Sequence, residues 1–182
     1  LGPQAYDNEW FGQQVQIITG QPITEILTPS LPTMSLITIP LTIFSPQTAR
    51  DTWIWLSLLF LLLALTILGV AHYKLNHDHI NVSVWLVLAA FALMFPAVAS
   101  NFYIGQSIIL FFCLFALTLY GLVTDRDWLV GLTLGLALIL KTTGLALWFL
   151  PLIHGRWRAL AWGAGTAAGV AFLSLPWIGI DT

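Results

Sequence analysis

Long apolar runs alternate with short polar segments along this chain, and the lengths of the runs predict its elements. Residues 52–71, 82–100 and 107–124 are uncharged apolar runs, and 158–176 has the same character after an initial Arg. Each is about 20 residues long, the length that a helix needs to cross the roughly 30 Å hydrocarbon core of a membrane. The pattern therefore predicts four transmembrane helices.

The run 128–153 permits two interpretations. As one helix, it would place Lys141 near its centre, which is a costly position for a cation. As a hairpin, its arms 128–140 and 143–153 reach only about 20 Å each and are too short to cross unaided. Since a Thr-Thr-Gly sequence follows Lys141 directly and favours a break there, we expect two short, paired helices that meet at a polar tip.

Residues 1–51 differ from the rest of the chain. The first part is polar and rich in turn-forming residues, with one short amphipathic stretch. Residues 31–45 are apolar but interrupted by Pro32 and Pro40, and as a helix they would span about 22 Å, short of the hydrocarbon core. We expect a juxtamembrane or re-entrant helix here, and hence an extracytoplasmic segment 1–51 that covers a transmembrane bundle of residues 52–182.

The composition agrees with a membrane protein. Of the 182 residues, 58% are hydrophobic and only 8% are charged, whereas soluble domains carry about a quarter charged residues. The formal net charge of −2 gives no reason to expect nucleic acid as a partner, and a single cysteine, Cys113, excludes an intrachain disulfide. Because the chain starts without Met and stops just after an apolar segment, we expect it to be part of a longer, all-α polytopic protein of the cytoplasmic membrane.

The basic residues predict an orientation. Four of the six Lys and Arg residues lie in connections that the helix pattern assigns to one side of the membrane: Lys74, Arg126, Arg156 and Arg158. The positive-inside rule makes this the cytoplasmic side. Residues 1–51, the segment 101–106 and Lys141 then share the outer side.

One loop contains a group of residues that superficially suggests a metal site: His72, His77, Asp78 and His79. Their spacing matches no tight site of the kind that holds zinc. We therefore expect a solvated cytoplasmic loop and no metal there.

The order of several motifs along the chain carries a family resemblance. They are Asn101, Gly105-Gln106, Gly131, Gly135, Lys141 and Arg156-Trp157-Arg158. In this order the chain resembles the polyprenol-phosphate-sugar-dependent glycosyltransferases of the GT-C fold, in particular glycosyltransferase family eighty-seven, which includes mannosyl- and arabinosyltransferases of bacterial envelopes. The resemblance covers most of the chain and is strongest over residues 95–160.

The chain departs from the family pattern in two places. The family's aromatic-Pro-Pro-Leu sequence is here Ser30-Leu31-Pro32-Thr33-Met34. The first transmembrane helix of the family should precede Asp7, and we expect it and the later spans to lie in the rest of the longer protein.

The resemblance implies a function. A mannose-like hexose or a pentose would move, with inversion, from a polyprenyl-phosphate sugar to a lipid or glycan acceptor at the outer face. The family uses an Asp in its first outer loop as general base, and Asp7 matches that position, with Glu9 as the competing carboxylate. Such a base takes the proton of the acceptor hydroxyl as it attacks the anomeric carbon. We expect no cofactor besides the donor substrate, and the need for a divalent metal stays open.

Four further residues are candidates for binding the substrate. Lys141 is placed to stabilise the departing phosphate, although a snorkelling lysine that anchors a helix end would look the same. We expect Asn101, Tyr103 and Gln106 to line the substrate cavity, whereas capping or interhelical hydrogen bonds are the alternative roles for Asn101 and Gln106.

Two other classes of protein fit parts of the pattern. In a transporter or channel subunit, Lys141 and Gln106 would line a solute path, and transporters often contain internal repeats and broken helices. The run at Lys141 is broken, but the chain shows no convincing repeat, which favours the enzyme. In a purely structural subunit the polar residues would only join helices together.

Overall fold

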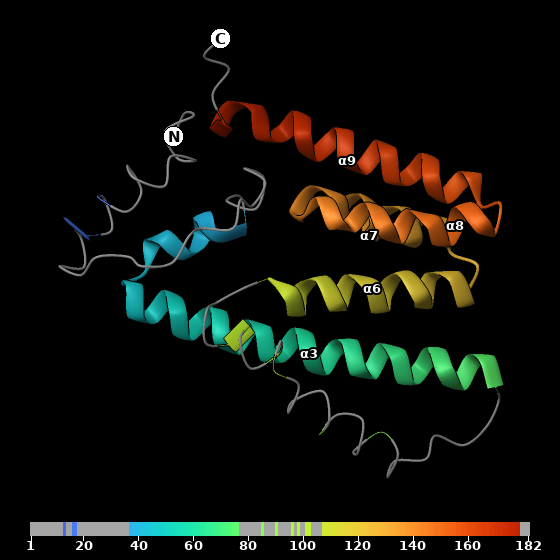
Figure 1. The fold of residues 1–182 in the computed structure, drawn as a ribbon, viewed down its shortest axis with the longest axis horizontal. Helices are drawn as coiled ribbons and strands as arrows, with labels where there is room; N and C mark the ends of the chain where they lie inside the picture. Colours follow the sequence, from blue (N-terminus) through green and yellow to red (C-terminus); the bar gives the residue numbers. More distant parts are fainter. Residues whose placement is uncertain are drawn as a thin grey trace.

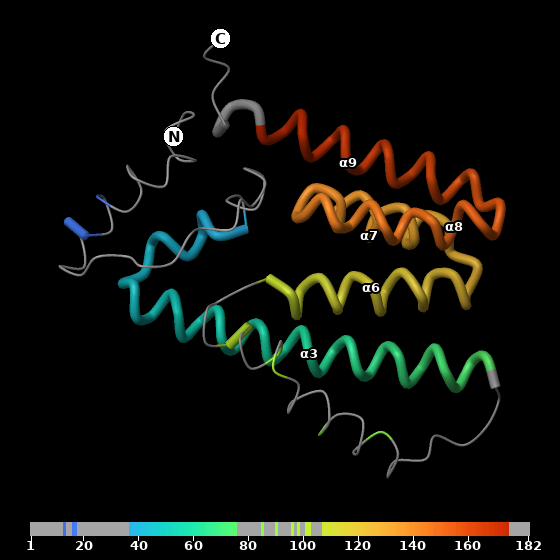
Figure 2. Tube along the Cα trace, in the orientation of Figure 1, coloured from blue at the N-terminus to red at the C-terminus, as the bar shows by residue number. Residues whose placement is uncertain are grey.

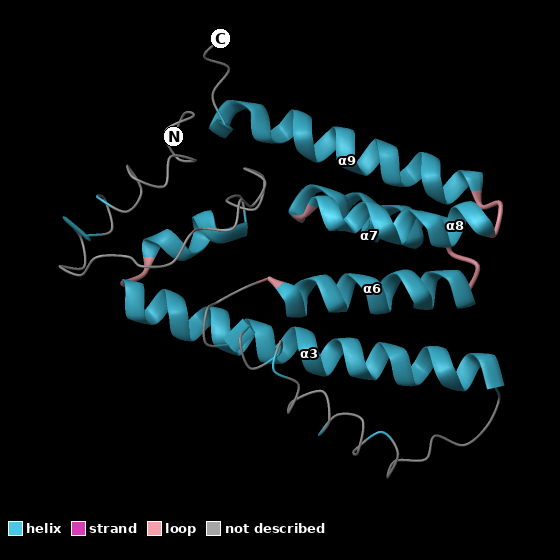
Figure 3. Cartoon of the chain, in the orientation of Figure 1, coloured by secondary structure: helices cyan, strands magenta, loops and turns pink. Residues whose placement is uncertain are grey.

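The computed structural model describes residues 37–76, 101–102 and 107–178, together with the isolated positions 13, 16, 17, 85, 90, 96 and 98. These residues form helices and short connections, without a strand in the described ranges, as an all-α protein requires (Figure 3). The expected span 82–100 and the polar part of segment 1–51 lie almost wholly outside the described residues.

The longest element is α3, Pro46–Asn76. Its start is determined by Ser45, whose Oγ accepts a hydrogen bond from the Thr48 N–H at 3.3 Å, and by Pro46, whose fixed φ suits the first helical position. The helix therefore begins ahead of the expected boundary at residue 52 and includes Arg50 and Asp51 in its first turns. A short 3-10 helix, η2 (Ile39–Ile43), precedes it and packs against it.

Among the described residues, one helix is long and apolar enough to cross a membrane, judged by length and composition: Pro46–Leu75. Three apolar helical segments are shorter: Ile108–Val123, Asp127–Leu140 and Thr142–Ile153.

Four helices lie side by side in one row, in the order α3, α6 (Ile108–Val123), α7 (Asp127–Leu140) and α9 (Trp157–Ile178) (Figure 1). Each packs against the next, and a fifth strip, η3 (Thr142–Trp148) followed by α8 (Phe149–Ile153), packs on α7 and α9. The chain direction, followed by colour in Figure 2, shows that α3 and α6 run one way and α7 and α9 the other.

Small residues determine how closely the helices approach. Ala64 of α3 meets Cys113 and Ala116 of α6 in one buried cluster. Between α6 and α7, the hydroxyls of Thr118 and Thr133 are buried and lie 2.8 Å apart in a hydrogen bond.

The α7–α9 contact depends on glycines. A Cβ atom at Gly131 would lie 2.2 Å from Cβ of Trp162, and one at Gly135 would lie 2.6 Å from Cβ of Thr166. Both distances are far below van der Waals contact, so the backbones approach as closely as they do only because these positions lack a side chain.

The run 128–153 is broken at Lys141. Helix α7 ends at Leu140, and Lys141 is extended, with φ −155° and ψ 134°. The single-helix interpretation is therefore wrong, and the run is a hairpin. Its second arm differs from the expected α-helix in that Thr142–Trp148 is 3-10 and only Phe149–Ile153 is α.

Two similar turns close the opposite end of the bundle. Asp125 between α6 and α7 has φ 54°, and Gly155 between α8 and α9 has φ 65°. In each turn, the residue that follows donates its backbone N–H to a carbonyl of the preceding helix. The Arg126 N–H donates to the Gly121 carbonyl at 2.9 Å, and the Arg156 N–H donates to the Pro151 carbonyl at 2.9 Å. This is a Schellman-type ending, which satisfies the last carbonyls of a helix within the backbone.

Candidate functional site

A cavity of about 350 Å³ lies beside the Lys141 tip. One face of α6 supplies its apolar wall through residues at helical spacing: Ile108, Phe111, Phe112 and Phe115. The α6 N-cap, the hairpin tip and η3 complete the lining, with Ser107, Lys141, Thr143 and Leu147.

The lining divides into a charged part and an apolar part. Lys141 is exposed, so its ammonium group keeps contact with water while its stem lies along the cavity. The phenylalanines offer an uncharged surface to any chain that enters. Ser107 stands at the N-terminus of α6, where the helix dipole also favours an anion. Together these groups suit a ligand that has an anionic head and an apolar tail.

The hairpin holds Lys141 at this position. The N–H of Gly144 donates to the carbonyl of Lys141 at 2.8 Å, and the indole N–H of Trp148 donates to the carbonyl of Leu134 at 3.3 Å. The second arm is thus hydrogen-bonded both to the tip and to α7. These two bonds fix the backbone of the turn that bears Lys141.

Asn101 is fully buried, and its side chain caps α6. Its Oδ1 accepts a hydrogen bond from the N–H of Ile109 at 3.3 Å, whereas Ser107, the N-cap residue itself, makes no side-chain cap bond. Among the described residues, the Nδ2 group of Asn101 has no hydrogen-bond partner. This is the capping role that the sequence left open, and Asn101 is not among the residues that line the cavity.

The other predicted site residues lie outside the described residues. These are the candidate bases Asp7 and Glu9 and the candidate binding residues Tyr103 and Gln106. Their roles stay predictions.

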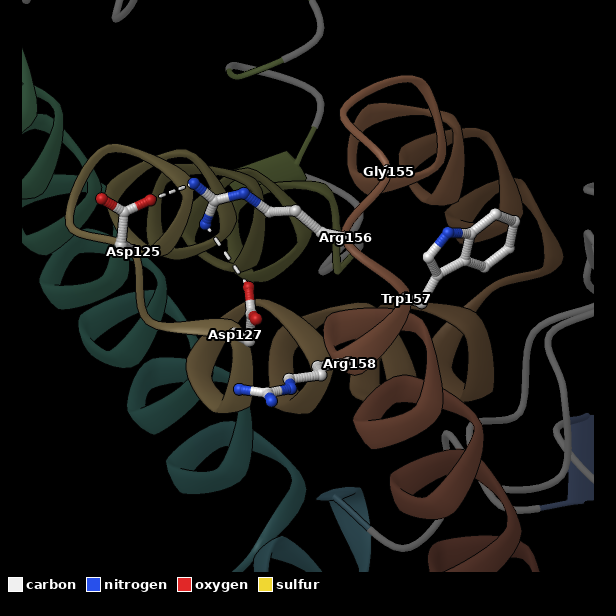
Figure 4. Close-up of a pocket in the computed structure, with 6 residues that line it drawn as sticks. All are labelled: Asp125, Asp127, Gly155, Arg156, Trp157 and Arg158. Carbon is white, nitrogen blue, oxygen red and sulfur yellow. Dashed lines mark hydrogen bonds and ion pairs between the residues drawn. The ribbon is translucent and has the colours of Figure 1, made fainter.

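The opposite end of the bundle holds an ion-pair cluster that sequence reasoning missed. Figure 4 shows Arg156 reaching from the α8–α9 turn toward two carboxylates of the α6–α7 turn, Asp125 and Asp127. Its Nη2 pairs with Asp125 and its Nη1 lies 3.4 Å from Oδ1 of Asp127. Only 23% of the Arg156 side chain is exposed, so this cation joins two turns that are distant in sequence.

Basic residues separate along the bundle. Lys141 lies at the end of α7, while Arg126 and Arg156 lie at the other end, with Lys74 in the last turn of α3 (Figure 1). A metal site finds no support in the part of the chain that the structure describes, since no group of three or more His, Cys, Asp and Glu residues converges there. His77, Asp78 and His79 are outside that part.

Comparison with known proteins identifies the class. Residues 32–182 match glycosyltransferase family 87, a family of membrane glycosyltransferases, and the chain belongs to this family. It is also similar to an alpha-(1->3)-arabinofuranosyltransferase of Corynebacterium glutamicum, with 30% identity over 129 residues. That alignment covers 71% of this chain and 29% of the relative, so the chain spans less than a third of the relative's length. No solved structure matches the chain.

Proposed function

We propose that this chain is part of a multi-pass glycosyltransferase that moves a sugar from a polyprenyl-phosphate donor to a lipid or glycan acceptor at the outer face of the cytoplasmic membrane. Membership of glycosyltransferase family 87 supports the reaction class. The observation that carries the choice of donor is the position of Lys141 beside a cavity walled by three phenylalanines of α6.

The two parts of the cavity match the two parts of such a donor. The phosphate of a polyprenyl-phosphate sugar is an anion, and a cation held beside it stabilises the charge that develops as the sugar leaves. The polyprenyl chain is purely apolar and would lie against Phe111, Phe112 and Phe115, the uncharged wall of the cavity.

The acceptor half of the reaction needs a base. In the proposed mechanism the carboxylate of Asp7 takes the proton of the acceptor hydroxyl. At the same time the oxygen of that hydroxyl forms a bond to the anomeric carbon. The bond from that carbon to the phosphate oxygen breaks at the same time and releases polyprenyl phosphate, so the anomeric configuration inverts. Glu9 is the alternative carboxylate. Both rest on the family resemblance.

The relative suggests which donor to test first. That relative is an arabinofuranosyltransferase, so polyprenyl-phosphate arabinofuranose, a pentose donor, is our first candidate. Polyprenyl-phosphate mannose, a hexose donor, is the second.

The experiment is a transfer assay in membranes that carry the full-length protein of which this chain is part. Each labelled polyprenyl-phosphate sugar is offered with membrane lipids as acceptor, to wild type, Asp7→Asn and Glu9→Gln. We expect transfer from one donor that Asp7→Asn abolishes and Glu9→Gln largely keeps. The reverse pattern would make Glu9 the base. Absence of transfer from every donor, in protein shown to be folded, would reject the enzyme in favour of a transporter with Lys141 in its path.

A further inference from the structure

A second site lies at the opposite end of the bundle from Lys141. A hollow of about 460 Å³ opens between the last turn of α3 and the α6–α7 turn. Two cations reach it from these two separate segments, Lys74 and Arg126, and both are exposed. Two phenols, of Tyr73 and Tyr120, and the Thr124 side chain complete its polar lining.

The carboxylates nearest in sequence do not neutralise these cations. Asp125 and Asp127 flank Arg126 in the chain, yet both are paired with Arg156 and point toward it (Figure 4). Within the described residues, no carboxylate pairs with Lys74 or Arg126. The hollow therefore gathers positive charge, while the negative charge of the same turn is directed elsewhere.

The cations are also not needed to close the end of α6. The carbonyl of Tyr120 accepts two hydrogen bonds, from the Thr124 N–H at 3.0 Å and from the Thr124 hydroxyl at 2.7 Å. The carbonyl of Gly121 accepts from the Arg126 N–H at 2.9 Å. Since backbone and hydroxyl donors satisfy these carbonyls, the side chains of Lys74 and Arg126 are left to bind an anion.

An apolar hollow of about 490 Å³ adjoins the polar one, and the two share Val123. His154 and Arg156 complete its wall, most of which is made of leucines from three helices: Leu75, Leu119, Leu122 and Leu150. Lys74 lines the polar hollow and Leu75 the second one, so the last turn of α3 contributes to both. A free phosphate would use only the first hollow, whereas a phospholipid would fill both.

We propose that these adjoining hollows bind an anionic phospholipid, with its phosphate between Lys74 and Arg126 and an acyl chain along the leucines. Basic side chains next to a membrane surface attract anionic lipids, and phenols at that level donate hydrogen bonds to headgroup oxygens. The site is separate from the proposed donor cavity, so its test does not depend on transfer activity.

The test is native mass spectrometry of the purified full chain, titrated with phosphatidylglycerol or phosphatidylcholine of the same acyl chains. The variants are Lys74→Gln, Arg126→Gln and the double variant, and Arg158→Gln is the matched control because this cation lies at the same end but outside both hollows. We expect wild type to prefer phosphatidylglycerol, each single variant to bind it about five-fold more weakly, and the double variant about 25-fold more weakly. Arg158→Gln should bind as wild type.

Three results would overturn the proposal. If the double variant binds phosphatidylglycerol as tightly as wild type does, Lys74 and Arg126 do not bind the lipid. An equal loss in Arg158→Gln would show a general effect of surface charge. Complete displacement of phosphatidylglycerol by millimolar inorganic phosphate would make the ligand a free anion rather than a lipid. The melting temperature of each variant, measured without added lipid, confirms that it is folded.

Discussion

A Cβ atom on Gly144 would lie 2.5 Å from both the carbonyl carbon and the carbonyl oxygen of Ala137. The 3-10 arm of the hairpin thus rests directly on the backbone of α7, one turn before Lys141. Backbone atoms on a packed helix cannot move aside as the end of a flexible side chain can. The contact makes Gly144 the residue that sets how the Lys141 tip is folded back.

We predict that Gly144→Ala opens the hairpin. Overpacking of this kind costs about 1–3 kcal/mol, so the melting temperature of the full chain should fall. Because Lys141 would move with the arm, the KM for the donor should rise as well. Thr142→Ala is the control, since Thr142 is exposed and two residues away. If both variants behave like wild type, the close packing of Gly144 does not position the tip.

A second prediction concerns the α7–α9 contact. Gly135→Ala would place a methyl group 2.6 Å from Cβ of Thr166 and 2.7 Å from the carbonyl oxygen of Gly163, and we expect it to destabilise the protein by about 1–3 kcal/mol. Gly165→Ala is the matched control on α9, because no described residue of another element lies within 4 Å of its Cβ position and Ala favours a helix over Gly. Thermal unfolding in detergent compares the two, and equal melting temperatures would contradict the packing.

A third prediction separates capping from cavity lining at Asn101. Asn101→Ala removes the acceptor of the Ile109 N–H, so it should cost about 1 kcal/mol of stability. Ser107→Ala should cost little, because the Ser107 side chain makes no cap bond. Chemical denaturation of the two variants measures the difference. A larger loss of stability in Ser107→Ala than in Asn101→Ala would show that Asn101 is not the residue that caps α6.

The sequence predicted the hairpin because its cause is local. A cation in the middle of an apolar run is costly, and the Thr-Thr-Gly sequence after Lys141 offers a place to break. The 3-10 form of Thr142–Trp148 had no such signal, since it depends on Gly144 meeting the backbone of α7. The start of α3 did have a local signal, Ser45 followed by Pro46, but hydropathy alone placed the boundary at residue 52.

The candidate site was predictable in part. Its cation, Lys141, followed from position in the pattern, but its aromatic wall did not, because Phe111, Phe112 and Phe115 look like any apolar helix face until the hairpin tip is placed beside them. The pairing of Arg156 with Asp125 could not be predicted from the sequence either, because the two residues belong to turns that only the folded bundle brings together.

The most direct test of the account is the donor KM of Lys141 variants in the full chain, assayed with the polyprenyl-phosphate sugar that wild type uses. A hydrogen bond between charged groups contributes about 1.5–3 kcal/mol, so Lys141→Ala should raise the donor KM or lower kcat/KM by roughly 10-fold to 100-fold, and Lys141→Arg should restore most of the loss. Arg50→Ala is the control, because Arg50 is exposed in the first turns of α3 and does not line the cavity. Wild-type kinetics in Lys141→Ala, or an equal loss in Arg50→Ala, would contradict the assignment of this cavity to the lipid-phosphate donor.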